Sequence, residues 1–496
     1  MLTKECKMNH RLFSQKGKKY VALLQLVFVQ VSIAQTILCA TGGKLAGSGT
    51  KADPFLIADY ADLKIVGTSA IYPGSAVYRL TADIDASASQ TENGGFVPIG
   101  DSAITYFTGT FHGAGHVINN LYINRSRTDT SYVGLFGYLA SATIDSLGVI
   151  DAEIAGVGVV GIGGIVGYNN TGTIIDCYST GSVTDSAGDI GGLVGWSGGT
   201  ITNCYSTANV TGNGCVGGVV GFNWGSITNC HAAGSVAGSD YVGGIVGDNV
   251  SEISSCYSTG NVTGNGMYVG GFAGGTGNVI TNCYSTGSVT GGNDVGSFIG
   301  LNNGTVTNCY AAGKTTGSSS VSGLVGENYY AGIVTDSYWD RQTTGWASGY
   351  GYNRNKFSAS GLNTAQMKDL SSFVGWDFTA VWSINPSING GYPYLGSNKP
   401  TYVEGSVPPK TFSLLQNFPN PFNPSTVIEY QLSANSCVTL KVYDVLGREV
   451  AKLVNEREAA GNHSIIFDAG SLPSGMYICN LEAGTYHETK KLLLLK

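Results

Sequence analysis

The chain has 496 residues, of which 74 are glycine and only 12% are charged, and its formal net charge is −7. Single hydrophobic cores rarely grow past about 250–300 residues, so this length requires several domains or a repeat architecture. The 42% of hydrophobic residues excludes a disordered chain, because disordered chains are poor in apolar residues.

The first 34 residues have the pattern of an export signal. Lys16, Lys18 and Lys19 form a basic flank, residues 20–34 are mostly apolar, and small residues precede Gln35. The apolar run is shorter than the ~20 residues that a membrane span needs, so we predict a cleaved signal peptide over 1–34 and no transmembrane span. An uncleaved membrane anchor is the alternative. Cleavage removes six of the 26 basic residues and one of the 33 acidic residues, which takes the net charge from −7 to −12 and argues against nucleic acid as a partner.

Residues 35–130 are predicted to form an N-terminal cap and the first coils of the repeat region that follows. A glycine-rich block of the form GGIVG then recurs every 26 to 30 residues, ending at Gly137, Gly167, Gly195, Gly221, Gly247, Gly274, Gly300 and Gly326. A second block, such as "IIDCYSTGSV" or "ITNCYSTANV", places a cysteine every 26 or 27 residues, at Cys177, Cys204, Cys230, Cys256, Cys283 and Cys309.

The fixed period near 26 predicts an all-β chain that forms a right-handed parallel β-helix, with the regular repeats over residues 131–345. Short β-favouring runs, such as Gly191 to Gly195, Thr200 to Tyr205 and Asn209 to Thr211, are separated by Gly, Asn, Ser and Thr and predict three strands per coil. The repeats predict about eight coils. A β-propeller would need about 40–45 residues per blade and is excluded by the period.

The residue after each cysteine is aromatic: Tyr178, Tyr205, His231, Tyr257, Tyr284 and Tyr310. Side chains alternate along a strand, and a solvent-facing position accepts His in place of Tyr, so we expect the cysteines inside and the rings outside. The cysteines then form a buried column, with disulfides between neighbouring coils as the alternative. The rings form an exposed stripe that could bind sugars or proteins, or that could simply shield one sheet.

Few groups in the repeats could catalyse a reaction. Asp189, Asp240 and Asp294 occupy nearly equivalent turns, about two coils apart, and are the candidates for a polysaccharide-cleaving site. Solvated turn aspartates are commoner than catalytic ones, so the sequence favours a protein that is not an enzyme. It predicts no metal site and no cofactor.

The repeats are followed by three further segments. Residues 346–396 are predicted to form a C-terminal cap, to which Trp339, Trp376 and Trp382 contribute, because an open solenoid end exposes core and strand edges. Residues 397–411 read as a linker. Residues 412–496, which include "NPFNPSTVIEY", "VYDVLGREV" and "LPSGMY", predict a small β-sandwich.

Two resemblances accompany these patterns. The repeat blocks resemble GLUG repeats of secreted and surface bacterial proteins, which implies an extracellular, adhesin-like setting and carries no catalytic motif. Residues 412–496 resemble the C-terminal sorting domain of type IX secretion. That resemblance implies the secretion machinery as a partner, export through periplasm and outer membrane, and release or attachment at the cell surface.

The sequence thus supports a secreted or cell-surface repeat protein, an adhesin or matrix protein that binds a glycan or a host or biofilm protein through the solenoid face. A β-helix polysaccharide-degrading enzyme, either a glycosidase or a lyase, is the first alternative. A structural surface-layer protein is the second.

Overall fold

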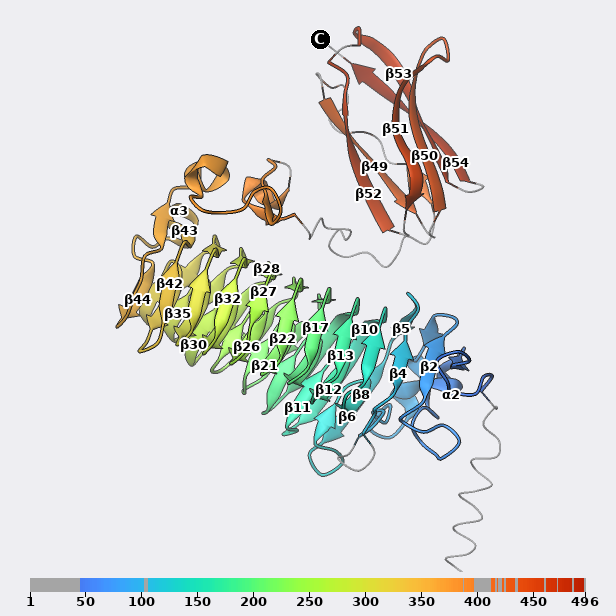
Figure 1. Ribbon diagram of the computed structural model, residues 1–496, viewed down its shortest axis with the longest axis vertical. Helices are drawn as coiled ribbons and strands as arrows, with labels where there is room; N and C mark the ends of the chain where they lie inside the picture. The colour runs from blue at the N-terminus through green and yellow to red at the C-terminus, as the bar shows by residue number, and fades with distance from the viewer. Residues whose placement is uncertain are drawn as a thin grey trace, which may run out of the picture. The chain divides into compact units, whose positions relative to one another are not determined.

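A computed structural model describes residues 45–101, 106–386 and 388–396, and, nearer the C-terminus, residues 412–414, 417, 422, 425–432, 436–458, 461–470, 472–483 and 486–494. The expected signal peptide (1–34) and linker (397–411) lie outside these residues. The chain divides into two compact units at Trp376 and Asp377. The first unit contains the repeats and the second contains the C-terminal sheets (Figure 1).

The first unit is a parallel β-solenoid of about 11 turns, which confirms the predicted fold class. One strand of every turn belongs to an 11-stranded sheet, here sheet A, so the coils number about eleven and not eight. At ~4.8 Å per strand the rod is on the order of 50 Å long. Sheet A comprises β1 (Phe55–Ile57), β2 (Val77–Leu80), β4 (Thr110–His112), β9 (Thr143–Asp145), β13 (Thr173–Ile175), β17 (Thr200–Thr202), β22 (Ser226–Thr228), β27 (Ile253–Ser254), β32 (Val279–Thr281), β37 (Thr305–Thr307) and β42 (Ile333–Thr335).

Three further sheets complete the coils. Sheet B takes β3 (Ile84–Asp85), β5 (Val117–Asn119), β6 (Tyr122–Ser126), β10 (Gly148–Val157), β14 (Tyr178–Asp185), β18 (Tyr205–Ser206), β19 (Asn209–Thr211), β23 (His231–Ala232), β24 (Val236–Gly238), β28 (Tyr257–Ser258), β29 (Val262–Gly264), β33 (Tyr284–Ser285), β34 (Val289–Thr290), β38 (Tyr310–Ala311), β39 (Thr315–Thr316), β43 (Tyr338–Asp340) and β45 (Ser360–Leu362). Sheet C takes β8 (Phe136–Leu139), β12 (Val166–Asn169), β16 (Val194–Ser197), β21 (Val220–Asn223), β26 (Val246–Asn249), β31 (Ala273–Thr276), β36 (Ile299–Asn302), β41 (Val325–Asn328) and β44 (Tyr350–Asn353). Sheet D takes β7 (Tyr132–Val133), β11 (Gly161–Gly163), β15 (Asp189–Gly191), β20 (Val216–Gly217), β25 (Val242–Gly243), β30 (Met267–Gly270), β35 (Asn293–Gly296) and β40 (Ser319–Ser322).

The prediction of three strands per coil is wrong, because two of the predicted runs are broken by corners. The run from Thr200 to Tyr205 breaks at Asn203, whose φ of 55° is left-handed and places Tyr205 in sheet B. Asn adopts this conformation more readily than most residues. The glycine block breaks between β15 and β16, where a side chain on Gly192 would lie 2.2 Å from the carbonyl oxygen of Gly218 in the next coil.

The core of the rod contains the predicted cysteine column. Cys177, Cys204, Cys230, Cys256, Cys283 and Cys309 are all buried and free, so the inward orientation is confirmed and the disulfide alternative is not. From Cys177 to Cys256, each backbone N–H donates a hydrogen bond to the Sγ atom of the cysteine in the next coil, at 3.3–3.4 Å. Ser337 ends the column, and its Oγ accepts from the N–H of Cys309 at 3.2 Å.

We expect the six column thiols to resist a thiol reagent in the folded protein. The thiolate is the reactive form, and burial raises the pKa of thiols such as Cys177, Cys204 and Cys283. Mass spectrometry after labelling should find these six positions unmodified under native conditions and modified in guanidinium. Native labelling of Cys230 or Cys256 at the rate of a small free thiol would contradict the buried column.

A second buried ladder runs along the inner ends of the sheet C strands. The side-chain amide of Asn223 donates to Oδ1 of Asn249 at 2.8 Å, and that of Asn302 donates to Asn328 at 2.8 Å. These amides also bond the turn backbone, as Asn223 does to Gly225 at 2.6 Å. Buried polar groups are tolerated only when they are hydrogen-bonded in this way, so the ladder fixes the corner between sheets C and A.

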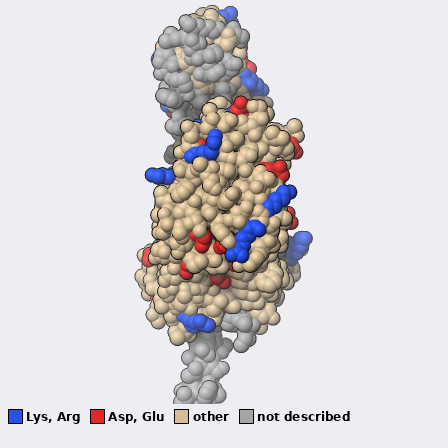
Figure 2. Space-filling view, turned by 90° about the vertical axis from the view of Figure 1, so that its left-hand side faces the viewer, with Lys and Arg blue, Asp and Glu red and all other residues tan. Residues whose placement is uncertain are grey.

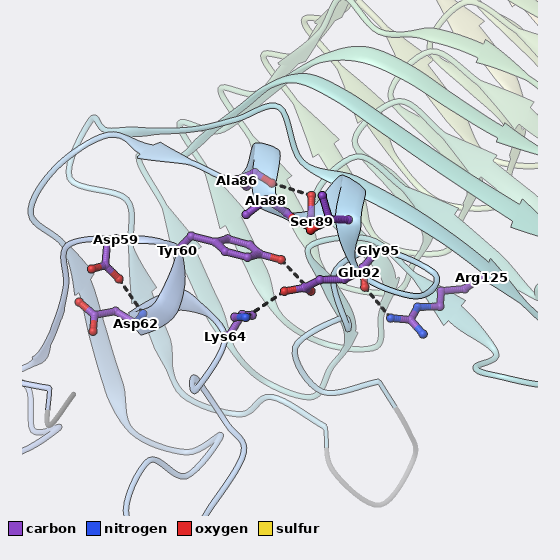
Figure 3. Close-up of polar contacts among 11 residues, drawn as sticks. Asp59, Tyr60, Asp62, Lys64, Ala86, Ala88, Ser89, Glu92, Gly95 and Arg125 are labelled. Atoms are coloured by element: carbon purple, nitrogen blue, oxygen red, sulfur yellow. Dashed lines mark hydrogen bonds and ion pairs between the residues drawn. The ribbon is translucent and has the colours of Figure 1, made fainter. Parts of the chain in front are cut away.

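The N-terminal end of the solenoid is closed by α2 (Tyr60–Leu63) and the short 3-10 helix η2 (Ser87–Thr91). Figure 3 shows the polar contacts there: Glu92 accepts from the Tyr60 hydroxyl at 3.0 Å and pairs with Nζ of Lys64 at 2.9 Å. Arg125 in β6 donates to the carbonyl oxygen of Gly95 at 2.7 Å. These contacts tie the cap to the first coils of sheet B.

Aromatic residues cover the C-terminal end of the solenoid. Trp339 in β43 is buried, and its indole N–H donates to the carbonyl oxygen of Trp346 at 3.0 Å, beyond α3 (Arg341–Thr344). Trp376 is buried and donates to the carbonyl oxygen of Asp336 at 2.8 Å. Its ring lies 5.6 Å from that of Tyr338, so the last turn of sheet B is shielded. The third predicted cap residue, Trp382, is also buried but belongs to the second unit.

The second unit holds a short hairpin of β46 (Trp382–Ser383) and β47 (Tyr394–Leu395) and two antiparallel sheets. One sheet has the order β48 (Ser413–Leu414), β49 (Ser425–Leu432), β52 (Gly461–Asp468), and the other β51 (Glu449–Glu458), β50 (Ser436–Asp444), β53 (Gly475–Ala483), β54 (Tyr486–Leu494). Residues of both sheets share one core, as expected of a sandwich. Within the described part of the chain, no helix is long and apolar enough to cross a membrane.

Candidate binding faces

The predicted aromatic residues form one continuous stack on sheet B. Each of these residues begins a sheet B strand, and the strands pair in register, so each ring lies above the next. From Tyr178 through Tyr205, His231, Tyr257 and Tyr284 to Tyr310, the ring centroids are 4.7–5.0 Å apart and the planes differ by 0–9°. Offset or stacked rings at this distance stabilise a sheet by about 0.5–1.5 kcal/mol per pair.

The stack differs in exposure from the prediction. Tyr178, Tyr205, His231 and Tyr257 are half-buried, whereas Tyr284 and Tyr310 are buried. For Tyr310 the reason is the C-terminal cap, which places Trp376 with its ring centroid 6.3 Å from that of Tyr310. The expectation of six exposed rings is therefore wrong at these last two positions.

Stacking also decides which part of each ring faces outward. A ring inside the stack has both faces covered by its neighbours. At the N-terminal end of the stack, the ring of Tyr178 lies over Gly148, since a side chain on Gly148 would lie 2.5 Å from Cζ of Tyr178. The stack thus presents ring edges and not flat ring faces. Burial also lowers the pKa of His231 to about 4, so this ring is neutral at physiological pH.

The three candidate aspartates do not all lie in one column of sheet D. On sheet D the register places Asp189, Cys215, Tyr241, Tyr268 and Asp294 in successive coils, so Asp189 and Asp294 are four strand steps, about 19 Å, apart. Asp240 lies one residue before Tyr241 and is therefore outside this column. It is a turn residue, and its carboxylate accepts a hydrogen bond from the N–H of Met267 at 2.6 Å. A pair of acids that act on one glycosidic bond needs a separation of about 5–10 Å, which the Asp189–Asp294 spacing does not meet.

The structure gives Asp189 a different acidic neighbour. Burial, together with the charge of Asp248 in β26, raises the pKa of Asp189 to about 6, although the Cys215 thiol within hydrogen-bonding reach lowers it. Burial also raises the pKa of Asp248. Burial and the Asp248 charge raise the pKa of Tyr241 to about 12. The sequence did not indicate this cluster, because its members come from different coils and from two sheets that meet at the Gly-Gly corner.

Asp189→Asn is expected to stabilise the folded protein at pH 7 by about 1–2 kcal/mol, after allowance for partial solvent exposure. Because the pKa of Asp189 is raised in the folded state, the folded protein loses stability as pH rises from the unfolded pKa of 3.8 through about 6. The gain of the variant should therefore vanish below pH 4. Denaturant unfolding at pH 7 and at pH 3.5 checks this, and an equal gain at both pH values would show that the charge is not the cause.

A second aromatic column lies on the outer face of sheet C and was not predicted. Tyr138, Tyr168, Trp196 and Phe222 pair in register, with ring centroids 4.8, 4.4 and 6.1 Å apart. All four are half-buried. The signal was present in the sequence, because Tyr168, Trp196 and Phe222 each directly follow the last glycine of the GGxxG block.

The same face carries an exposed tryptophan. Trp224 is 64% exposed, and Val250, which takes its place in the next coil, is 36% exposed. We call Tyr138, Tyr168, Trp196, Phe222, Trp224 and Val250 the sheet C aromatic patch. Asp248 follows Phe222 in the column and so borders the patch.

Charged groups are sparse around both columns. Residues 128–313 contain no Lys or Arg at all. Figure 2 shows one face of the molecule, on which Lys, Arg, Asp and Glu side chains are scattered among other residues. Within the described ranges, no three His, Cys, Asp or Glu side chains are placed to hold a metal ion.

Comparison with known proteins identifies parts of both units. The GLUG motif matches residues 158–184, 186–211, 212–237 and 265–290, and a secretion system C-terminal sorting domain matches residues 416–495. The chain therefore carries GLUG repeats and a type IX sorting domain, as the sequence indicated. A protein with this domain is exported to the outer cell surface or secreted, and the type IX machinery is its partner in export.

Two relatives are similar to part of the chain. Halomucin of Haloquadratum walsbyi is 40% identical over 164 residues, which are 31% of this chain and 2% of the relative. A protein of Evansella cellulosilytica named "Putative Gly-rich membrane protein" is 34% identical over 157 residues, which are 31% of this chain and 18% of the relative. The chain thus spans a small part of either relative. A crystal structure from Bacteroides ovatus, described as a "putative immunoglobulin A1 protease", is similar with a TM-score of 0.41 and 22% identity, over 71% of this chain and 94% of that one.

Proposed function

We propose that this secreted surface protein is an adhesin or matrix component that binds a glycan or another protein through a face of its solenoid. The observation that carries the proposal is the pair of aromatic columns along a rod that its sorting domain sends out of the cell. Exposed aromatic surface held on a rigid scaffold is typical of interaction sites. The names of the two relatives, a mucin and a membrane protein, agree with a role at the cell surface.

The exported protein, purified at full length, tests this proposal. It should bind to a defined set of immobilised glycans or to proteins in host or biofilm extracts. External protease should digest it on intact cells. Absence of binding together with depolymerising activity would contradict the proposal, whereas ordered lattices of the purified chain without any ligand would favour the surface-layer alternative.

Glycan cleavage is the second candidate, and one observation favours it: Asp189 has a pKa of about 6 and an acidic neighbour, Asp248. A carboxyl with a raised pKa can donate a proton to a leaving group while a second carboxylate remains ionised. If the protein is a hydrolase, Asp189→Asn and Asp248→Asn should each abolish the release of reducing ends. Activity that survives both substitutions would remove this candidate.

A further inference from the structure

We propose that the sheet C aromatic patch, centred on Trp196, Phe222 and Trp224, is the ligand face and that its ligand is an electrically neutral polysaccharide. This inference rests on the proposed function and makes it specific. It assigns binding to sheet C, whereas the tyrosine stack that the sequence suggested lies on sheet B.

The two aromatic columns differ in how far their ring faces are open. On sheet B the rings lie at 4.7–5.0 Å with planes within 9°, so neighbouring rings cover each other's faces. On sheet C, Tyr168 and Trp196 also stack closely, at 4.4 Å, but the spacing opens to 6.1 Å between Trp196 and Phe222. Among the residues that the structure describes, no other ring stacks on Trp224, which is 64% exposed. A sugar presents a flat face of C–H groups, which needs an open aromatic face of this kind.

The turns after the sheet C strands bring the rings of the patch together. Trp224 occupies, in its coil, the turn position that Gly198 occupies in the preceding one. A side chain on Gly198 would lie 2.9 Å from Cζ3 of Trp196, so this indole leans over the turn beside which Trp224 projects. Phe222 lies two residues before Trp224, and the three rings therefore share one face within two coils.

Hydrogen bonds hold this face rigid before any ligand binds. The backbone N–H of Trp224 donates to the carbonyl oxygen of Ser197 at 2.7 Å, and that of Val250 donates to Asn223 at 2.9 Å. Asn223 itself is fixed by the buried amide ladder. Immobilising side chains and loops on binding costs free energy, and a face that is already ordered avoids much of that cost.

The charge around the patch distinguishes between classes of ligand. The 186 residues from 128 to 313 include no Lys or Arg, and Asp248 directly follows the patch in its column. Polyuronates, sulfated glycans and nucleic acids would meet only negative charge. A second copy of this acidic chain is disfavoured for the same reason. Carboxylates accept hydrogen bonds from hydroxyl groups, so a neutral polysaccharide satisfies both the rings and Asp248.

The test uses the full-length exported protein with soluble β-glucan and mannan as neutral probes, polygalacturonate as an anionic probe and chitosan as a cationic one. Titration calorimetry and tryptophan fluorescence report binding at 50 and 500 mM salt. We expect binding to a neutral probe that is independent of salt, because it involves no ion pairs. Trp224→Ala should weaken it at least tenfold. The variant should fold, since Gly198 and Gly277 occupy the equivalent turn in other coils, and circular dichroism checks this.

Tyr205→Phe is the matched control, because it removes a hydroxyl group from the sheet B stack without disturbing the ring packing. Neutral glycan binding that survives in Trp224→Ala but falls in Tyr205→Phe would overturn the inference and leave the proposed function standing. Binding only to chitosan or to an extract protein, with a steep dependence on salt, would also overturn it. No binding to any probe or extract would instead remove the proposed function itself.

Discussion

Replacement of Gly218 by alanine is expected to destabilise the solenoid by at least about 3 kcal/mol. Gly218 lies at the corner between sheets D and C, and its Cα faces the next coil. An added Cβ would lie 2.1 Å from the carbonyl oxygen of Gly244 and 2.8 Å from Cβ of Ala232. The obstacle at 2.1 Å is backbone, which cannot rotate away, so adjacent coils must separate and lose ladder hydrogen bonds.

Gly277→Ala is the matched control for Gly218→Ala. It lies in a turn of the same rod, its nearest neighbours would be 3.8 Å or more from an added Cβ, and its φ is not left-handed. The free energy of unfolding of this variant should stay within about 0.5 kcal/mol of the parent. Chemical denaturation of the three proteins measures both effects. Equal stability of Gly218→Ala and Gly277→Ala would show that close contact between coils does not explain the glycine block.

This contrast explains how much of the fold the sequence predicts. The period of the repeat requires stacked coils, and the alternation of Cys177 and Tyr178 fixes which side chain points inward, so the parallel solenoid and its cysteine column follow from sequence alone. The number of strands per coil does not follow. It depends on corners such as Asn203, whose left-handed φ of 55° interrupts a run that otherwise favours a continuous strand.

The candidate sites show a different limit. Because the period varies from 26 to 30 residues, it aligns equivalent positions of successive coils only to within one or two residues. A shift of one residue moves a side chain to the other face of the strand. Asp240 therefore falls beside the column that Tyr241 occupies. The exposure of Tyr310 depends on Trp376, which is 66 positions away and reaches it only through the folded cap. Contacts between distant segments of this kind leave no local pattern.

The sheet C patch was missed for a related reason. The position after each GGxxG block holds Tyr168, Trp196 and Phe222, then Asp248, Gly275 and Leu301 in later coils. A column whose chemistry changes halfway along the rod does not stand out as a repeat, although the structure makes it continuous. In a repeat protein the binding residues are found among such departures from the consensus, whereas the invariant positions maintain the stack.

His231→Tyr is expected to make the solenoid resistant to acid. The pKa of His231 in the folded protein is about 4, against 6.5 for an ordinary histidine, because burial disfavours the charged ring. The folded state therefore binds fewer protons than the unfolded state between these pH values. The contribution to stability is complete above pH 6.5 and is lost as pH falls towards 4, by about 2–3 kcal/mol in total. Tyrosine, which occupies this position in the other five coils, has no such titration.

Thermal and denaturant unfolding of both proteins at pH 7.5, 5.5 and 4 would measure the effect. The variant and the parent should differ little at pH 7.5, and the difference should increase steadily to pH 4, because acidic groups elsewhere titrate equally in both proteins. His231→Phe should behave in the same way, since the pH dependence comes from removal of the imidazole and not from the new hydroxyl group. A difference that stays constant over this range would mean that the folded stack accepts a protonated ring. The sheet B face would then be open to water, and its rings would be accessible to ligands.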